Sequence, residues 1–227
     1  MPGCPILRKP YREGWDVKSP LAMPTLTVPE IACLLTPYIA VPLAPDALER
    51  LQTYLDLLLK WNAKTNLTAI RDPEQIVQRH FGESLFAAEQ IGSTWNTLLD
   101  FGSGPGFPGL PIQILYPEKF ILLAESQNKK AGFLREAARS LNLPTEVWPA
   151  RVDTLPADRL FDIITLRAVD NMERALTEAA TRLTPDGKLA ILTTATVVAE
   201  LPGLLATFPI PNTTDGVLAL TVPRGTL

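Results

Sequence analysis

Three alternate glycines, Gly102, Gly104 and Gly106, follow an apolar stretch that ends at Phe101. A residue without a Cβ atom can adopt a positive φ and lets a ligand lie against its backbone. The helix expected after the turn leaves its first backbone amides without partners inside the helix. The segment 98–109 therefore predicts a strand, a turn and a helix that together bind a ligand.

The spacing of these glycines departs from two well-known phosphate-binding loops. A dinucleotide fingerprint, GxGxxG, would need its third glycine at the position of Phe107, and no GxxxxGK[ST] pattern occurs. An acidic residue, Asp100, just before a GxGxG turn is similar instead to the first motif of Rossmann-like methyltransferases. In that motif the loop approaches the methionine part of the cofactor.

A second acidic residue, Glu125, ends the next apolar run of the chain. A carboxylate at the end of a buried strand can accept hydrogen bonds from both hydroxyl groups of a ribose. Taken alone, Glu125 could equally be a solvated acid in a turn. Together with the glycine loop, it favours a nucleoside ligand.

From Asn96 onward, short apolar runs alternate with amphipathic stretches, which is typical of βαβ units and a parallel sheet. We expect strands over residues 97–101, 120–124, 146–149, 162–166 and 188–193, and a closing strand over 216–222. We expect helices over 109–115, 129–141 and 172–183, the last ended by a turn at 184–187. The predicted fold class is α/β, with helices on both faces of the sheet.

The chain before residue 96 has helical signals. Capping boxes pair Thr27 with Glu30 and, as the stronger signal, Asp46 with Glu49. Leucines at helical intervals follow the second box, and a further helix is expected over 73–90, with Asp72 as its N-cap. We therefore divide the chain into a leader (1–26), a helical element (27–95) and a ligand-binding domain (96–227). Nine of the 22 prolines lie in the first 45 residues, which favours a loosely ordered leader.

The net charge of −3 lacks the excess of Lys and Arg that binding to phosphates normally recruits. Net charge averages over all faces, however, and two groups of cations could form a local basic surface or belong to ordinary solvated helix faces. One group is Lys60, Lys64, Arg71 and Arg79; the other is Lys129, Lys130, Arg135 and Arg139.

The chain has two cysteines, one histidine and no apolar run near 18 residues. This composition favours a cytoplasmic protein with no membrane partner. It also argues against a metal site, because Cys/His zinc sites need more ligands than these residues supply.

Several motifs in order along the chain resemble the RsmG (GidB) family of bacterial 16S ribosomal RNA (guanine-N7)-methyltransferases, over roughly residues 45–193. They are Trp61–Thr68, Arg79–Leu85, Asp100–Pro111, Ser126–Leu134, Ala150–Asp153, and Phe161-Asp162 followed by Arg167-Ala168. The resemblance implies a Rossmann-like sheet that binds S-adenosylmethionine, preceded by helices. It also implies methylation of a guanine of the small-subunit RNA near the decoding centre, by a protein that we expect to be a monomer.

The resemblance also implies which residues contact the cofactor. Gly102 and Phe107 of the loop, Val152, Asp153 and Arg167 match family positions that do so. Gly104, Gly106 and Glu125 join them through the loop argument above. Asp153 could accept a hydrogen bond from the adenine amino group. Arg167 stands at the carboxyl edge of the sheet, where ligands of such folds bind; the alternative interpretation is that it is a surface cation.

For methylation at N7, the protein mainly has to align the methyl group of the donor with the acceptor lone pair. The N7 lone pair of guanine is free at neutral pH, so no general base is needed. We therefore assign no catalytic residue, and regard Arg167 as a candidate for positioning the substrate. Candidates for RNA contact are Arg79, His80, Lys129 and Lys130, although a lone histidine on a helix more often fixes packing.

The sequence departs from the family in three places. Glu83 and Glu125 stand where Asp is more common, and Thr193-Thr194 replace a usual Lys-Gly pair near a short tail. Two other interpretations therefore remain open. One is a Rossmann-like methyltransferase acting on a small molecule or a protein, and the other is a ribosome-associated module without turnover.

Overall fold

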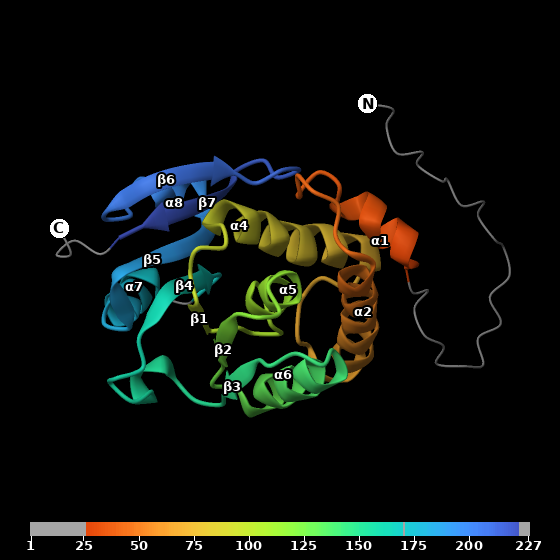
Figure 1. Ribbon diagram of the computed structural model, residues 1–227, viewed down its shortest axis with the longest axis horizontal. Coiled ribbons are helices and arrows are strands. Elements are labelled where there is room, and N and C mark those ends of the chain that lie inside the picture. The colour runs from red at the N-terminus through yellow and green to blue at the C-terminus, as the bar shows by residue number, and fades with distance from the viewer. Residues whose placement is uncertain (1–25, 170, 223–227) are drawn as a thin grey trace, which may run out of the picture.

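The computed structural model describes residues 26–169 and 171–222, and its centre is a seven-stranded sheet in the order β3-β2-β1-β4-β5-β7-β6 (Figure 1). The strands are β1 (Thr97–Phe101), β2 (Phe120–Ala124), β3 (Glu146–Trp148), β4 (Phe161–Arg167), β5 (Leu183–Thr194), β6 (Leu204–Pro209) and β7 (Gly216–Thr221). Strands β1 to β5 are parallel, and β7 runs antiparallel to both of its neighbours. This arrangement confirms the predicted α/β class.

The predicted strands are all present, but two predictions at the beginning of β5 are wrong and one strand was missed. Residues 184–187, expected to form a turn, belong to the beginning of β5, where the pairing with β4 is irregular between Phe161 and Ile163. The helix before them ends at Ala180 rather than at Leu183. Strand β6 was not predicted, and it forms a hairpin with the closing strand β7.

The two faces of the sheet carry separate apolar cores, because successive side chains of a strand point to opposite faces. Leu98 and Leu123 lie in one core, whereas their neighbours Leu99 and Leu122 lie in the other. Helix α7 (Met172–Ala180) covers the second face together with the short α8 (Ala195–Val198). The remaining α-helices cover the first face (Figure 1).

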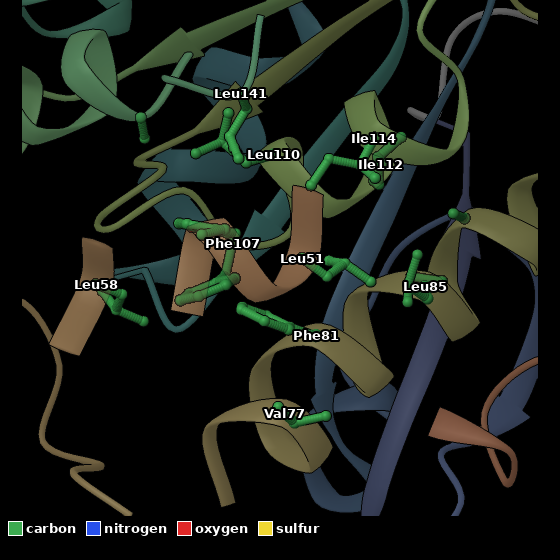
Figure 2. Close-up of a cluster of buried hydrophobic side chains, with 14 of the residues drawn as sticks. Leu51, Leu58, Val77, Phe81, Leu85, Phe107, Leu110, Ile112, Ile114 and Leu141 are labelled. Carbon is green, nitrogen blue, oxygen red and sulfur yellow. The ribbon is translucent and has the colours of Figure 1, made fainter. Parts of the chain in front are cut away.

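The N-terminal helices are packed onto that first face rather than standing apart from the sheet. They are α1 (Val28–Leu35) and α2 (Pro45–Thr65), and they share one core with α5 (Gly109–Leu115) and α6 (Asn128–Ser140). Figure 2 shows side chains of α2, such as Leu51, in the same cluster as Phe81, Phe107 and Leu110. The N-terminal helices therefore pack directly against the glycine loop.

One of the two predicted capping boxes is confirmed. The Thr27 hydroxyl accepts a hydrogen bond from the Glu30 amide, and the Glu30 carboxylate accepts one from the Thr27 amide. The box at Asp46 is wrong, because the N-cap of α2 is Ala44, two residues earlier; it makes no side-chain bond, and the helix begins at Pro45. Proline is well suited to the first helical position, and Asp46 instead lies in the first turn.

The helix predicted over 73–90 is continuous but not uniform. It consists of α3 (Pro73–Ile76), a π-helical segment (Val77–Gly82) and α4 (Glu83–Ile91), and the Asp72 side chain caps it as predicted. A π segment is uncommon and often marks a functional position. This one carries Arg79 and His80. No helix within residues 26–169 and 171–222 has the length and apolar character needed to cross a membrane.

Candidate functional site

The glycine loop has the backbone conformation that its composition predicts. Gly102, Gly104 and Gly106 all have positive φ, at 70°, 57° and 104°. The Ser103 carbonyl accepts hydrogen bonds from the amides of Gly106 and Phe107, at 2.7 and 3.1 Å, which closes the turn. A non-glycine residue is strained at such φ values, so the turn depends on these three positions.

Two polar side chains from outside the loop hold it in place. The buried Asp100 carboxylate accepts hydrogen bonds from the Gly109 amide, at 3.1 Å, and from the Thr165 hydroxyl, at 2.8 Å. Burial raises the pKa of Asp100 to about 6, although these hydrogen bonds oppose the rise. From α2, the Tyr54 hydroxyl donates to the Pro105 carbonyl. A Cβ atom on Gly106 would lie 2.7 Å from the Tyr54 hydroxyl, so the loop and α2 fit closely.

Two cavities meet at Gly102, which lines both. One, of about 310 Å³, is bordered by the loop, Glu125, His80 and Arg167. The other, of about 210 Å³, lies toward α7 and is bordered by Ala124, Ser126 and Val152. Both lie at the carboxyl ends of parallel strands, beside the point between β1 and β4 where the strand order reverses. Ligands of open α/β sheets bind at this point.

The Glu125 carboxylate is buried and faces the loop. One oxygen accepts a hydrogen bond from the Gly104 amide at 2.9 Å, and the other accepts one from the Gln127 amide at 2.7 Å. A carboxylate oxygen can accept two hydrogen bonds, so each oxygen keeps capacity for one further donor. This geometry is compatible with the predicted contact to two ribose hydroxyls.

Phe107 lies in the loop, but it is mainly a core residue. It is 5% exposed and packs against Tyr54 and Phe81, with ring centroids 5.4 and 5.8 Å away. The His80 ring stacks on it at 4.5 Å, and His80 Nε2 lies 2.8 Å from the Thr68 hydroxyl. Both rings line the larger cavity. His80 therefore faces the larger cavity as well as fixing helix packing.

His80 is neutral at physiological pH. Burial, reinforced by the positive charges of Arg167 and Arg79, lowers its pKa to about 3 from an ordinary 6.5. Between these values the unfolded chain binds a proton that the folded protein does not. Stability is therefore lost as the pH falls through this window.

We predict that His80→Gln flattens this pH dependence. As the pH falls from 7 to 4.5, wild type should lose stability relative to the variant, by at most about 1.4 kcal/mol per pH unit. Urea unfolding at a series of pH values measures the difference. Parallel curves for the two proteins would show that His80 is charged in the folded state. The titration of Asp100 is common to both proteins and cancels in the comparison.

Arg167 is held by Arg79 of the π segment and by Glu83, the first residue of α4. Its Nη2 atom donates to the Arg79 carbonyl at 2.6 Å and pairs with the Glu83 carboxylate at 2.7 Å. The other Glu83 oxygen pairs with Arg79 Nε at 2.8 Å. The Arg167 side chain is 16% exposed, so it is not the free surface cation that the alternative interpretation describes. Glu83 fixes its orientation, and Arg167 lines both the larger cavity and a third cavity that Glu83 also lines.

The two residues predicted to follow the third strand lie in different surroundings. Val152 is buried and lines the smaller cavity. Asp153 does not line that cavity; its carboxylate pairs with Arg151 at 3.0 Å and, more loosely, with Arg174 at 3.7 Å. Val152 therefore lines the same cavity as Gly102, whereas Asp153 lies outside that cavity.

The predicted RNA contacts are only partly brought together. Lys130 borders the larger cavity, and Arg79 borders a third cavity beside Arg167. Lys129 is exposed and lines neither. Sequence reasoning missed Arg174 and Glu178 of α7, which line the smaller cavity. Only the helix that carries them was predicted from the sequence.

These features define the class of protein as a Rossmann-like methyltransferase. Its sheet has a glycine loop at the point between β1 and β4 where the strand order reverses. The fold is similar to that of a putative O-methyltransferase from Klebsiella pneumoniae, with a TM-score of 0.55 and 16% identity. That similarity covers 81% of this chain and 92% of that one. Identity at this level shows the fold alone.

The family follows from the sequence comparison. The family model described as rRNA small subunit methyltransferase G (GidB) matches residues 47–208, so this chain belongs to that family. Ribosomal RNA small subunit methyltransferase G of Xanthomonas euvesicatoria is 42% identical over 137 residues, which are 60% of this chain and 64% of that protein. Its counterpart in Halorhodospira halophila is 38% identical over 73% of this chain and 79% of that protein. The match thus spans slightly less than two thirds of the Xanthomonas protein.

Proposed function

We propose that this chain transfers a methyl group from S-adenosylmethionine to N7 of a guanine in 16S ribosomal RNA near the decoding centre. The observation that carries the proposal is the crevice at Gly102, where two cavities meet, one of which is bordered by the Glu125 carboxylate and Arg167. Membership of the rRNA small subunit methyltransferase G family supports the reaction and the RNA.

The residues that border the crevice fit the cofactor. Glu125 would accept the ribose hydroxyls, Val152 would contact the adenine, and Gly102, Gly104 and Gly106 would let the ligand lie against the loop. Phe107 and Arg167 border the cavity expected to hold the amino-acid part. Asp153 is the weakest member of the predicted set, because it would have to leave Arg151 to reach the adenine.

The chemistry requires positioning rather than proton transfer. S-adenosylmethionine supplies, when bound, a methyl group on a positively charged sulfur. The N7 lone pair forms the new bond as the carbon–sulfur bond breaks, and the electron pair of that bond stays with the sulfur. The ring gains the positive charge and no proton moves, so a neutral His80 is consistent with the reaction.

In this proposal residues 96–227 hold the cofactor, and the helices of 27–95 close the crevice through His80 and Thr68. Arg79, His80, Lys129 and Lys130 are the candidate RNA contacts, of which Lys129 lies farthest from the cavities. We propose that the protein acts as a monomer, in the bacterial cytoplasm where its RNA substrate is made.

Transfer of a tritiated methyl group to 16S ribosomal RNA lacking the modification tests this function. Label is expected at one guanine, and the RNA is expected to become sensitive to cleavage at N7-methylguanine. Label on another substrate would favour a different methyltransferase. Cofactor binding without transfer to naked RNA, precursor particles or assembled small subunits would favour a module without turnover.

A further inference from the structure

A third cavity, of about 530 Å³, opens beside the cofactor crevice. It shares Arg167 and Ala168 with the larger of the two crevice cavities, so a group placed in it lies next to the expected methyl donor. It occupies the carboxyl ends of β4 and β5, and the turn before β7 closes its far side. Its volume is within the range of ordinary ligand pockets, which is about 300 to 1,000 Å³.

Arg167, which lines both this cavity and the larger crevice cavity, has an unused hydrogen-bond donor. Arg167 Nη2 is engaged by Glu83 and by the Arg79 carbonyl, whereas Nη1 is buried and has no partner within residues 26–169 and 171–222. A buried guanidinium nitrogen without a partner is costly, and a ligand oxygen would remove that cost.

The far wall has an unused acceptor. Asp215 lies in the turn before β7, and its carboxylate makes only a 3.5 Å contact with the neighbouring Thr214 hydroxyl. No cation in the described part of the chain pairs with it. The other carboxylate of the cavity, Glu83, already holds two arginines. Leu192, Val197 and Ile210 also line this cavity and offer an apolar surface for a flat ring.

We infer that this cavity receives the acceptor guanine itself, turned out of the RNA, with Asp215 reading its Watson–Crick edge. The inference rests on the proposed function. In guanine, O6 lies beside N7, and the N1–H and 2-amino donors lie on the side away from N7. With N7 toward the cofactor crevice, Arg167 Nη1 donates to O6 while Asp215 accepts from N1–H and the 2-amino group. Enzymes that modify bases commonly read an extruded base in this way.

The charge of the reaction favours the same assignment. Methyl transfer moves a positive charge from the sulfur onto the purine ring. A carboxylate at the far edge of that ring stabilises this developing charge. Asp215 therefore contributes to the rate as well as to the choice of base.

The test exchanges the target guanine of a synthetic RNA substrate for inosine, which lacks the 2-amino group. Wild type is expected to methylate the inosine substrate at least about 10-fold more slowly, because the Asp215 carboxylate then loses one of its donors. Asp215→Ala is expected to methylate the guanine substrate about 10-fold or more slowly than wild type, and to treat guanine and inosine alike to within about 2-fold.

Asp186→Ala is the matched control, since Asp186 is an exposed carboxylate at the other end of β5. It should keep the preference of wild type for guanine. An Asp215→Ala variant that retains the full preference would overturn the inference, as would a wild type that does not distinguish the two bases. Absence of transfer by wild type to any form of the RNA would instead contradict the proposed function. In that case an NMR titration with guanosine 5′-monophosphate still tests the cavity. Chemical shift changes at Asp215 and Arg167 would support the inference, and their absence would oppose it.

Discussion

Gly102→Val is expected to weaken cofactor binding by about 100-fold or more while the domain still folds. Gly102 lines both crevice cavities and has a φ of 70°, so a branched side chain both strains the turn and enters the space for the ligand. The strain is about 1–3 kcal/mol, which is less than the stability of a typical domain, at about 5–15 kcal/mol. Calorimetric titration with S-adenosylhomocysteine measures the affinity, and thermal unfolding measures the stability.

Gly132→Ala is the control for this variant. Gly132 lies inside α6, and no atom lies within 4 Å of an added Cβ. An alanine in a helix interior is favoured over glycine by about 0.5–1 kcal/mol, so this variant should be slightly more stable and should bind the cofactor normally. Normal affinity in Gly102→Val would mean that the ligand lies elsewhere.

Glu83→Ala is expected to lower both stability and methylation. Its carboxylate is buried and is the shared partner of Arg79 and Arg167. Removing one partner of a buried ion pair typically costs about 3–5 kcal/mol, and the exposure of Arg79 places this case near the lower value. Arg167 also loses a contact that orients it, and misplacement by about 1 Å can reduce a rate about 100-fold. Urea unfolding and single-turnover methylation measure the two effects.

Two further substitutions make the Glu83 result specific. Glu83→Asp keeps the charge and should recover part of the lost rate. Glu146→Ala removes a carboxylate that pairs with Arg159 on the surface, and it should change stability by at most about 1 kcal/mol. If Glu83→Ala kept the wild-type single-turnover rate, Arg167 would have no part in positioning.

The parts of the fold that the sequence predicts well are those with strong local patterns. The segments that form β1 and β2 are apolar. The three glycines between β1 and α5 have positive φ values, which other residues rarely adopt. The hairpin of β6 was missed for an equally local reason. Pro209 is the last residue of that strand and Pro202 and Pro211 flank it, and an edge strand tolerates prolines that would argue against a central strand.

The local geometry of the candidate site was predicted where a single segment builds it, and less well where distant segments meet. The conformation of the glycine loop and the position of Glu125 followed from neighbouring residues. The link from Glu83 to Arg167 joins residues 84 positions apart, and the π segment that allows it has no local signature. The packing of His80 on Phe107 depends in the same way on how α2 and the following helix fit the loop.

The central claim is that the turn after Asp100 holds the cofactor across Gly102. A crystal structure of the full chain with S-adenosylhomocysteine tests it most directly. We predict that the ribose lies on Glu125, the adenine beside Val152, and the amino-acid part toward Phe107 and Arg167. A nucleoside bound at any other place, with the crevice at Gly102 empty, would contradict this account.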